Sequence, residues 1–295
     1  MTSYKPLMML IAGLFLFSGS ILAASATTQD SPSQDASPEV RRWLGPDGEW
    51  LPFETDEEVL DFLSTAEVVR EKKLSDGINR PLKLTLEKAG VRANAIFRTV
   101  DIERIDRANA SAHDRLFRDS YRFEIAAYEM SRLLGLGNIP PVVLRTFGNR
   151  EGSLQLWIER AMPESKRMAR GERPADPAGW SRQRQMMAIF DNLIYNFDRN
   201  PGNMLFDAAG KLWLVDHTRS FKRLPALVDA EKVRICDQDL WRHLRQLDPE
   251  EVRARLAPVL EPVDIEAVLK RRALLIDRLS SRIAEMGDQA VLIGP

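Results

Sequence analysis

The chain has 295 residues, of which 44% are hydrophobic, 29% charged and 7% aromatic, a composition typical of a globular protein and unlike that of a disordered or collagen-like chain. At this length one large domain, or one domain of two lobes, is expected, because hydrophobic cores stop growing at about 250 to 300 residues. The 42 basic and 43 acidic residues leave a net charge of -1, which argues against a general electrostatic attraction to nucleic acid.

Sulfur and imidazole ligands are scarce in this sequence. The single cysteine, Cys236, excludes an internal disulfide and a cysteine-based zinc site, and the three histidines are His113, His217 and His243. A bound metal ion would therefore be held by oxygen ligands.

The N-terminus carries an apolar run. After Lys5, residues 7–26 are free of charge and end in the small-residue pattern Ala-Ser-Ala, which predicts a secretory signal peptide over residues 1–26. An uncleaved membrane anchor is the alternative, because the run approaches the roughly 20 residues that span a bilayer. Residues 27–39 are rich in Ser, Asp, Gln and Pro, and they predict a disordered linker. Both alternatives predict an exported protein, either periplasmic, secreted or anchored in the membrane.

Residues 40–159 predict a small, β-rich N-terminal lobe. Thr55 and Glu58 form a capping-box pattern before an apolar run, which predicts a helix that ends near Thr65. Alternating stretches on both sides of Gly90 predict a β-hairpin over residues 81–100. Further expected elements are a helix over 118–136 and strands over 142–147 and 153–159.

Residues 160–295 predict a larger helical lobe, which follows the first lobe near residues 159–162. It begins with a polar, arginine-rich segment, and a hairpin is expected to turn at Asp207 to Gly210. The helices expected from apolar spacing cover 180–195, 237–247, 249–256 and 265–286. The predicted fold class is α+β: two lobes, the smaller one rich in strands with one helix and the larger one helical.

The most informative segment holds three polar residues at fixed spacing. Asp198 follows a predicted helix, Asn203 comes five residues later, and the predicted hairpin delivers Asp216 thirteen residues after Asn203. Phosphoryl transfer needs a carboxylate that accepts the proton of the attacking hydroxyl, and oxygen ligands for the metal ion on the nucleotide phosphates. Protein kinases use an Asp-x-x-x-x-Asn loop and an Asp after the next strand for these tasks.

Two segments carry a resemblance to a known superfamily. The stretch Phe-Asp-Arg-Asn-Pro-Gly-Asn-Met-Leu at residues 197–205, with Leu-Val-Asp-His at 214–217, resembles the catalytic and metal-binding loops of the atypical kinases. These include the phosphatidylinositol 3- and 4-kinase group, the HipA-type bacterial kinases and the secretory-pathway kinases of the four-jointed type. Residues 124–142, which end in Pro-Pro-Val, resemble the secretory-kinase helix that carries an ion-pairing glutamate.

The resemblance implies a protein-kinase-like fold, ATP and Mg2+ or Mn2+ as cofactors, and a role for each matching residue. Asp198 is implied to be the catalytic base, Asn203 and Asp216 the metal ligands, and Glu124 the ion-pairing glutamate of the N-terminal lobe. His217, next to Asp216, is expected to orient the loop rather than to bind metal.

The sequence departs from the superfamily at the phosphate-binding lysine. Arg98 stands on the strand where the pattern expects that lysine. Its guanidinium keeps the charge and can bridge a phosphate and Glu124, but its planar fork is larger than an ammonium group and is not an equivalent replacement. Lys83, on the preceding strand, is a substitute candidate for the same task.

Other nucleotide contacts are expected from position. Gly77 with Pro81 is expected to mark the turn that covers the nucleotide, although the sequence has no G-x-G-x-x-G motif there. The adenine is expected near residues 157–162, which makes Glu159 a further nucleotide-binding candidate.

Several of these residues have a structural alternative. Asp198 and the Asn, Pro and Gly residues after it are also typical of an ordinary turn. Glu124 could instead form an ordinary ion pair with a nearby arginine of the same predicted helix, such as Arg118 or Arg122. Asp191 is expected to lie on the helix surface or to brace the loop, rather than to bind metal.

The function predicted is that of an exported atypical kinase that transfers the γ-phosphate of ATP to a hydroxyl of an unidentified protein, sugar or lipid headgroup. Export creates a conflict in a bacterium, whose periplasm is not expected to hold ATP, and none in a eukaryotic secretory lumen. Two alternatives stay open: a kinase-shaped protein that binds a nucleotide or phosphorylated ligand without turnover, which Arg98 would suit, and an envelope scaffold that binds no such ligand.

Overall fold

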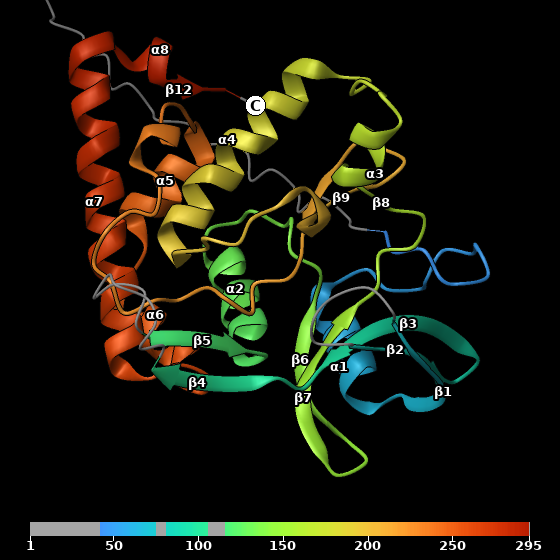
Figure 1. Ribbon diagram of the computed structural model, residues 1–295. Coiled ribbons are helices and arrows are strands. Elements are labelled where there is room, and N and C mark those ends of the chain that lie inside the picture. Colours follow the sequence, from blue (N-terminus) through green and yellow to red (C-terminus); the bar gives the residue numbers. More distant parts are fainter. Residues whose placement is uncertain (1–41, 75–80, 106–115, 295) are drawn as a thin grey trace, which may run out of the picture. The chain divides into compact units, whose positions relative to one another are not determined.

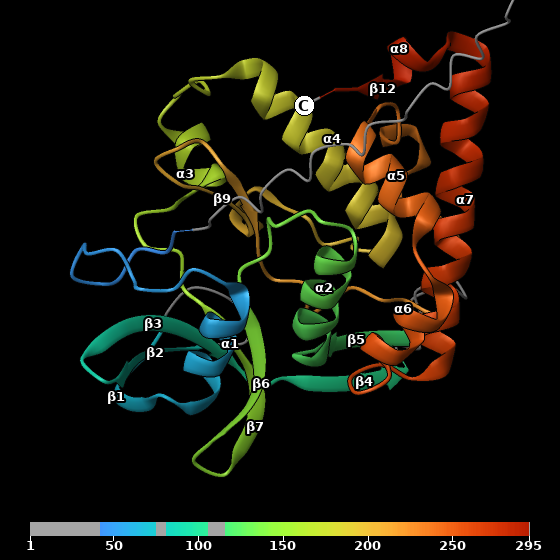
Figure 2. The same cartoon turned by 180° about the vertical axis from the view of Figure 1, so that it is seen from behind.

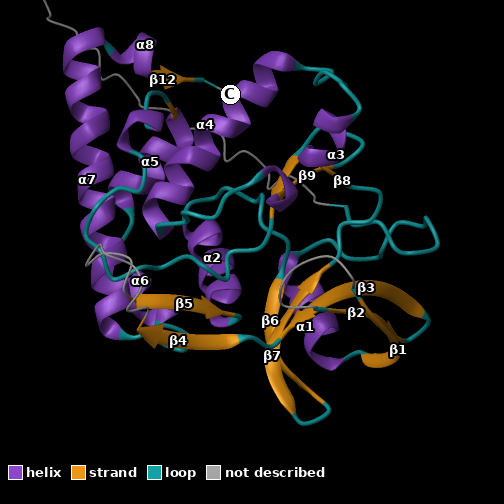
Figure 3. Cartoon of the chain, viewed as in Figure 1, coloured by secondary structure: helices purple, strands orange, loops and turns teal. Residues whose placement is uncertain are grey.

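The computed structural model describes residues 42–74, 81–105 and 116–294, all within one compact unit, Val40–Pro295. The predicted signal peptide and linker lie outside the described residues, as do Gly77 and His113. The described residues form two hydrophobic cores, one under a β-sheet and one among helices. The core among helices also includes Phe123 and Val142, which lie within residues 40–159, the range predicted for the smaller lobe. Figure 3 shows where the strands and the helices lie.

The smaller lobe is built on a five-stranded antiparallel sheet (Figure 1). Its strands, in spatial order, are β1 (Glu67–Lys73), β2 (Leu82–Lys88), β3 (Val91–Arg98), β7 (Arg150–Leu156) and β6 (Val142–Phe147). Leucines and other apolar side chains at alternate positions of β2, β3 and β7 pack on one face against helix α1 (Asp56–Thr65). The capping box of Thr55 and Glu58 is present, which confirms the predicted helix. Strands β2 and β3 pair antiparallel, which confirms the predicted hairpin.

A second hairpin, which the sequence analysis missed, precedes the next helix. Strands β4 (Asp101–Ile105) and β5 (Leu116–Ser120) pair antiparallel and lead into α2 (Arg122–Leu133). The prediction that this helix begins at residue 118 is therefore wrong. All five residues of β4 are exposed, so the strand lacks the one buried face whose alternation reveals a strand. Strand β1 was not predicted either, so the smaller lobe has more strands than the sequence predicted.

The larger lobe is helical. Its helices are α3 (Glu164–Ala169), α4 (Pro177–Ile194), α5 (Gln238–Gln246), α6 (Pro249–Leu256), α7 (Pro262–Met286) and α8 (Asp288–Val291), with short 3-10 turns η1 (Pro201–Asn203) and η2 (Ala230–Lys232). Its short strands are β8 (Met162–Pro163), β9 (Met204–Phe206), β10 (Leu212–Leu214), β11 (Cys236–Asp237) and β12 (Leu292–Ile293).

The four helices predicted for this lobe are confirmed, with shifts at their ends. Helix α4 begins three residues earlier than predicted, because Asp176 caps it and Pro177 occupies its first position. Helix α7 runs along the outer edge of the lobe in both views (Figures 1 and 2). None of the helices in the described part of the chain combines the length and the apolar composition that a membrane span needs.

Candidate active site

A cavity of about 960 Å3 lies between the polar face of the sheet and the helical lobe. It gathers Arg98 from the end of β3 with Asp198, Asn203 and Asp216 from the loops around the β9–β10 hairpin. Asp198, Asn203 and Asp216 are close in sequence, whereas Arg98 lies at least 100 positions before them, and the fold brings all four to one cavity. Trp157, from the segment where the adenine was predicted, also lines it.

The loop that carries Asp198 is shaped by side-chain hydrogen bonds. Helix α4 ends at Ile194, and the next residue, Tyr195, has a φ of 52°, in the left-handed region. The Asn196 side chain then accepts a hydrogen bond from the backbone N–H of Asp198 at 3.2 Å. Asn200 accepts one from Gly202 and begins the short turn η1. These two bonds, in which an asparagine side chain accepts from the backbone two residues later, hold the backbone of the loop in one conformation.

Arg199 braces this loop from inside. Its Nε and Nη2 atoms donate to the buried carboxylate of Asp191, and its Nη1 donates to the backbone oxygens of Asn203 and Val215, both at 2.9 Å. The prediction that Asp191 braces the loop is therefore confirmed. Because Arg199 reaches the backbone on both sides of the hairpin, it ties the Asp198 loop to the segment that leads into Asp216.

The amide of Asn203 has a defined orientation. Its Nδ2 donates to the backbone oxygen of Asp198 at 3.3 Å, so its Oδ1 is left as an acceptor. Asp216 follows β10 with a φ of 58°, and the Thr218 hydroxyl donates to its Oδ1 at 3.2 Å. A carboxylate and an amide oxygen suit Mg2+ or Mn2+, with nucleotide phosphates as further ligands. Among the described residues no group of three His, Cys, Asp or Glu side chains could hold a metal ion alone.

Glu124 lies at the centre of a buried polar cluster behind the cavity. Its side chain is fully buried, and it accepts hydrogen bonds from the backbone N–H of His217 and from His217 Nδ1, both at 3.1 Å. Arg98 Nε lies 3.5 Å from its Oε1. Burial raises the pKa of the Glu124 carboxyl, but Arg98 and His217 outweigh it and hold the pKa at about 2. Burial also lowers the pKa of His217, so the ring is neutral near pH 7.

The nearby arginines considered as partners for Glu124 bind elsewhere. Arg118 pairs with Asp264, and Arg122 pairs with Asp101 and Glu151. The alternative of a local ion pair for Glu124 is therefore wrong, because Arg118 lies on β5 and not on the helix.

Arg98 has a donor left over. Its Nη1 atom is buried and has no hydrogen-bond partner among the described residues, although Arg98 lines the cavity. A buried N–H without a partner is costly, and an anionic group in the cavity would satisfy it. Gly152 lets β7 approach this point, because a Cβ atom there would lie 2.2 Å from the Arg98 backbone oxygen.

Lys83 and Glu159 form a pair at one side of the site. Lys83 Nζ lies 3.8 Å from Glu159 Oε1 and 4.1 Å from the centre of the Trp157 ring. Neither residue is among the described residues that line the main cavity, and Lys83 lines a smaller cavity of about 500 Å3. Asn94 also donates to Glu159, at 2.6 Å. The roles predicted for Lys83 and Glu159 stay predictions.

Two cavity residues were missed by the sequence analysis. Arg219 Nη1 lies 3.3 Å from Asp198 Oδ2, and its Nε lies 3.2 Å from Asp119 Oδ2. Burial raises the pKa of Asp198; Arg219 opposes this, whereas the charges of Asp216 and Asp119 add to it. No sequence pattern pointed to Asp119, which lies on the unpredicted strand β5. Arg219 lies just beyond the stretch that carries the resemblance.

No protein-family model matches the sequence, and no curated protein matches it. Solved structures match in fold. The structure of hydra Fam20 with sugar superimposes with a TM-score of 0.64 and 17% identity, over 82% of this chain and 94% of that chain. The Golgi casein kinase gives a TM-score of 0.59 and 15% identity, over 81% and 79%. Its structure with Mn/ADP bound gives 0.58 and 15%, over 81% and 78%.

The fold is kinase-like and matches that of Fam20 and of the Golgi casein kinase. This confirms the predicted two-lobed, kinase-like α+β fold and the fold-level resemblance on which it rested. At 15% to 17% identity the likeness concerns the fold alone.

Proposed function

We propose that this chain is an exported atypical kinase that transfers the γ-phosphate of ATP to a hydroxyl acceptor. The observation that carries the proposal is a single cavity lined by Asp198, Asn203, Asp216 and Arg98, with Arg98 paired to the buried Glu124. Each of these residues supplies a group that phosphoryl transfer needs: a base, two oxygen ligands and a cation for phosphate. The kinase-like fold, and the Mn/ADP bound to one structural neighbour, support this assignment.

Binding of the nucleotide is assigned to both lobes. The adenine would lie near Trp157, and the unpartnered Nη1 of Arg98 would donate to a phosphate oxygen. Asn203 Oδ1 and the Asp216 carboxylate would hold Mg2+ or Mn2+, which when bound neutralises charge on the phosphate oxygens. The Glu124 carboxylate keeps the Arg98 guanidinium at the cavity wall.

In the transfer step Asp198 accepts the proton of the acceptor hydroxyl. The acceptor oxygen forms a bond to the γ-phosphorus, and the bond from that phosphorus to the oxygen bridging the β- and γ-phosphates breaks. ADP leaves with the electron pair of that bond. The raised pKa of Asp198 makes its carboxylate a stronger base for this proton.

The experiment that tests this proposal compares the mature protein with Asp198→Asn, using labelled ATP and an extract of the source cell's own envelope or secretory compartment as acceptor. Asp198→Asn is expected to keep its nucleotide affinity and to lose at least about a hundredfold in transfer rate. Asp277→Asn, at an exposed position of α7, serves as the matched control and is expected to behave as wild type. Equal transfer by Asp198→Asn and wild type would remove Asp198 from the chemistry.

One observation favours a second function, recognition of a phosphorylated ligand without turnover. Arg98 replaces the lysine that the superfamily pattern expects, and guanidinium binds phosphate strongly without requiring catalysis. A wild-type protein that binds ATP but transfers phosphate to no acceptor, water included, with Arg98→Lys equally inactive, would support this second function over the first.

Export is the other part of the proposal and rests on the residue pattern of positions 1–26. Fused to a reporter that works only outside the cytoplasm, residues 1–30 are expected to confer activity, and mass spectrometry is expected to find a mature N-terminus near Thr27. Activity of a cytoplasmic reporter instead would contradict export.

A further inference from the structure

We propose that Arg219 and Asp119 are positioning residues for Asp198: Arg219 holds the carboxylate of the base, and Asp119 holds Arg219. This inference rests on the proposed function, in which Asp198 accepts the acceptor's proton. It adds two residues that neither the motif nor the resemblance contains.

The guanidinium of Arg219 bridges two carboxylates. Its Nη1 lies 3.3 Å from Asp198 Oδ2 and its Nε lies 3.2 Å from Asp119 Oδ2, and all three residues line the main cavity. Because a guanidinium is planar and rigid, a contact at Nε fixes the direction of the contact at Nη1. The position of Asp119 therefore determines where Arg219 presents its charge to Asp198.

The orientation of the Asp198 carboxylate depends on this bridge more than that of a buried carboxylate would. The Asp198 side chain is 41% exposed, whereas that of Asp119 is 3% exposed. Within the described part of the chain, Arg219 makes the one polar contact to the Asp198 carboxylate. The hydrogen bonds that Asp198 makes with Asn196, Asn200 and Asn203 all involve its backbone: its N–H donates to Asn196, and its oxygen accepts from the other two. An exposed carboxylate held at one point loses its orientation when that point is removed, and proton transfer depends on orientation.

The strand that carries Asp119 is itself fixed on both sides of that residue. Ser120 donates its backbone N–H to the oxygen of Thr218 at 2.8 Å. Arg118 donates to both oxygens of the fully buried Asp264, at 2.7 and 3.0 Å, and to the backbone oxygen of Phe221 at 3.1 Å. Since Thr218 and Phe221 flank Arg219, the strand β5 and the segment of Arg219 are held together along their length.

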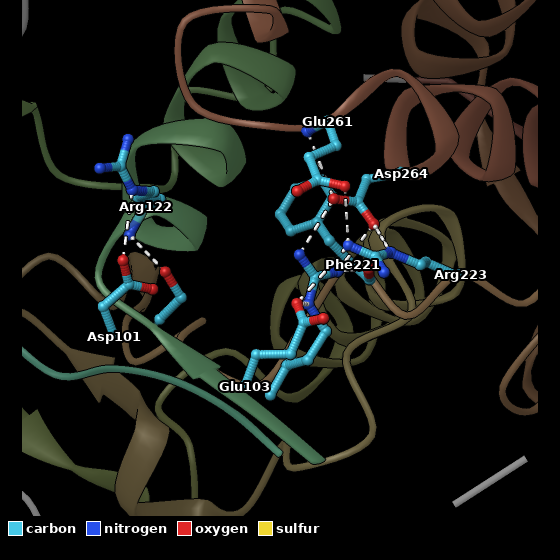
Figure 4. Close-up of polar contacts among 9 residues, drawn as sticks. Asp101, Glu103, Arg122, Phe221, Arg223, Glu261 and Asp264 are labelled. Carbon is cyan, nitrogen blue, oxygen red and sulfur yellow. Dashed lines mark hydrogen bonds and ion pairs between the residues drawn. The ribbon is translucent and has the colours of Figure 1, made fainter. Parts of the chain in front are cut away.

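Figure 4 shows the outer end of this arrangement. Asp264, in the first turn of α7, also accepts from Arg223 Nε at 3.0 Å, and Glu103 of β4 lies 3.5 Å from Arg223. The pair of Arg118 and Asp264 is bidentate and buried, and such pairs are geometrically restrictive. Helix α7 thereby anchors the β4–β5 hairpin, and the hairpin presents Asp119 to the cavity.

The kinetic test uses Arg219→Met, Asp119→Asn and the double variant, with transfer measured at varied ATP. Each single variant is expected to lower kcat at least about tenfold and to change KM for ATP less than about twofold, because neither residue is assigned to the nucleotide. The double variant is expected to be no slower than Arg219→Met, since the two residues act through one contact. Arg219→Lys is expected to recover part of kcat, because an ammonium keeps the charge but cannot bridge both carboxylates with a fixed fork.

A matched control separates the bridge from packing. Arg104 lies on the same hairpin with its guanidinium 4.7 Å from the centre of the Phe117 ring, the ring that Arg219 approaches to 5.6 Å. Arg104→Met is expected to leave kcat unchanged. An equal loss in Arg104→Met, losses that multiply in the double variant, or a rise in KM for ATP at constant kcat would each overturn the proposal.

A second measurement needs no enzyme activity. In urea unfolding, Asp198→Asn and Asp119→Asn are expected to be non-additive with Arg219 present and additive in the Arg219→Met background. Additivity in both backgrounds would overturn the bridge. If coupling is found and the wild type transfers no phosphate, the bridge stands and the proposed function fails.

Discussion

His217 Nδ1 lies 3.1 Å from Glu124 Oε2, and the backbone N–H of the same histidine donates to Glu124 Oε1. The residue directly after Asp216 is therefore bound at two points by helix α2. Because Glu124 also lies 3.5 Å from Arg98, one buried carboxylate sets the position of the predicted metal loop and of the predicted phosphate cation together.

His217→Phe tests the side-chain half of this contact. The variant keeps an aromatic ring against Phe190, which lies edge to face at 6.3 Å, and removes the Nδ1–H donor. We expect it to lower the free energy of unfolding by about 1 to 3 kcal/mol, since a buried carboxylate loses a hydrogen bond. In the Glu124→Gln background the same change should cost less in urea unfolding, and an equal cost would mean that the ring matters only for packing.

Glu124→Gln tests the charge through pH. The folded-state pKa of Glu124 is about 2, below its ordinary value of 4.5, so its ionisation stabilises the fold above pH 4.5, and this stabilisation is lost as the pH falls towards 2. The stability advantage of wild type over Glu124→Gln is thus expected to be full near pH 7 and to shrink progressively below pH 4.5. Unfolding in urea at several pH values measures it, and a difference independent of pH would contradict the assigned charge.

Arg98 variants separate nucleotide binding from turnover. Arg98→Ala is expected to weaken ATP binding at least about tenfold in calorimetry, because a phosphate loses a charged donor, whereas Arg98→Lys should retain binding and preserve or raise turnover. Arg92→Ala is the matched control, since Arg92 lies on the same strand and pairs with Glu87 outside the main cavity. Unchanged affinity in Arg98→Ala would remove Arg98 from the phosphate site.

Asp216→Asn tests the metal site with little strain on the backbone. Asp216 has a φ of 58°, a conformation that asparagine tolerates better than alanine. The variant is expected to abolish the Mg2+-dependent rise in melting temperature with ATP and to leave the melting temperature without ligands little changed. Asn203→Ala should also abolish the rise, but it should cost about 1 kcal/mol of stability because its bond to the Asp198 backbone is lost.

If Asp216→Asn and Asn203→Ala both unfold the protein without ligands, these residues form the turns and do not bind metal. Asp277→Asn, on the exposed face of α7, controls for the loss of one carboxylate and should leave the Mg2+-dependent shift in place.

Short-range spacing explains why part of the site could be predicted. One loop and one short hairpin carry Asp198, Asn203 and Asp216. Their proximity therefore follows from local structure, which the turn-forming residues of this segment predict. The partners of Glu124 do not follow from local spacing, because Arg98 and His217 reach it from distant segments. The pairing with Arg98 was expected from the resemblance, whereas the bond from His217 was not, and local spacing pointed to Arg118, which lies on a strand.

The β4–β5 hairpin shows why the rest of the fold was harder to predict. Its strand β4 has no buried face, and its partner β5 looks helical in sequence because it runs directly into α2. What fixes β5 as a strand is its pairing with β4 and the bond from Ser120 to Thr218, and neither can be read from local propensity. Asp119 was missed for the same reason.

The apolar side of α2 belongs to the helical lobe. Buried residues such as Ala126, Ala127 and Met130 pack in the same core as α4 and α7, not in the core under the sheet. Helix α2 also contacts strands β6 and β7, and its residues Tyr128 and Arg132 bond to Asp56 and Glu57 of α1. The helix is therefore held by both lobes, and through Glu124 it links Arg98 of the sheet to the loop of Asp216.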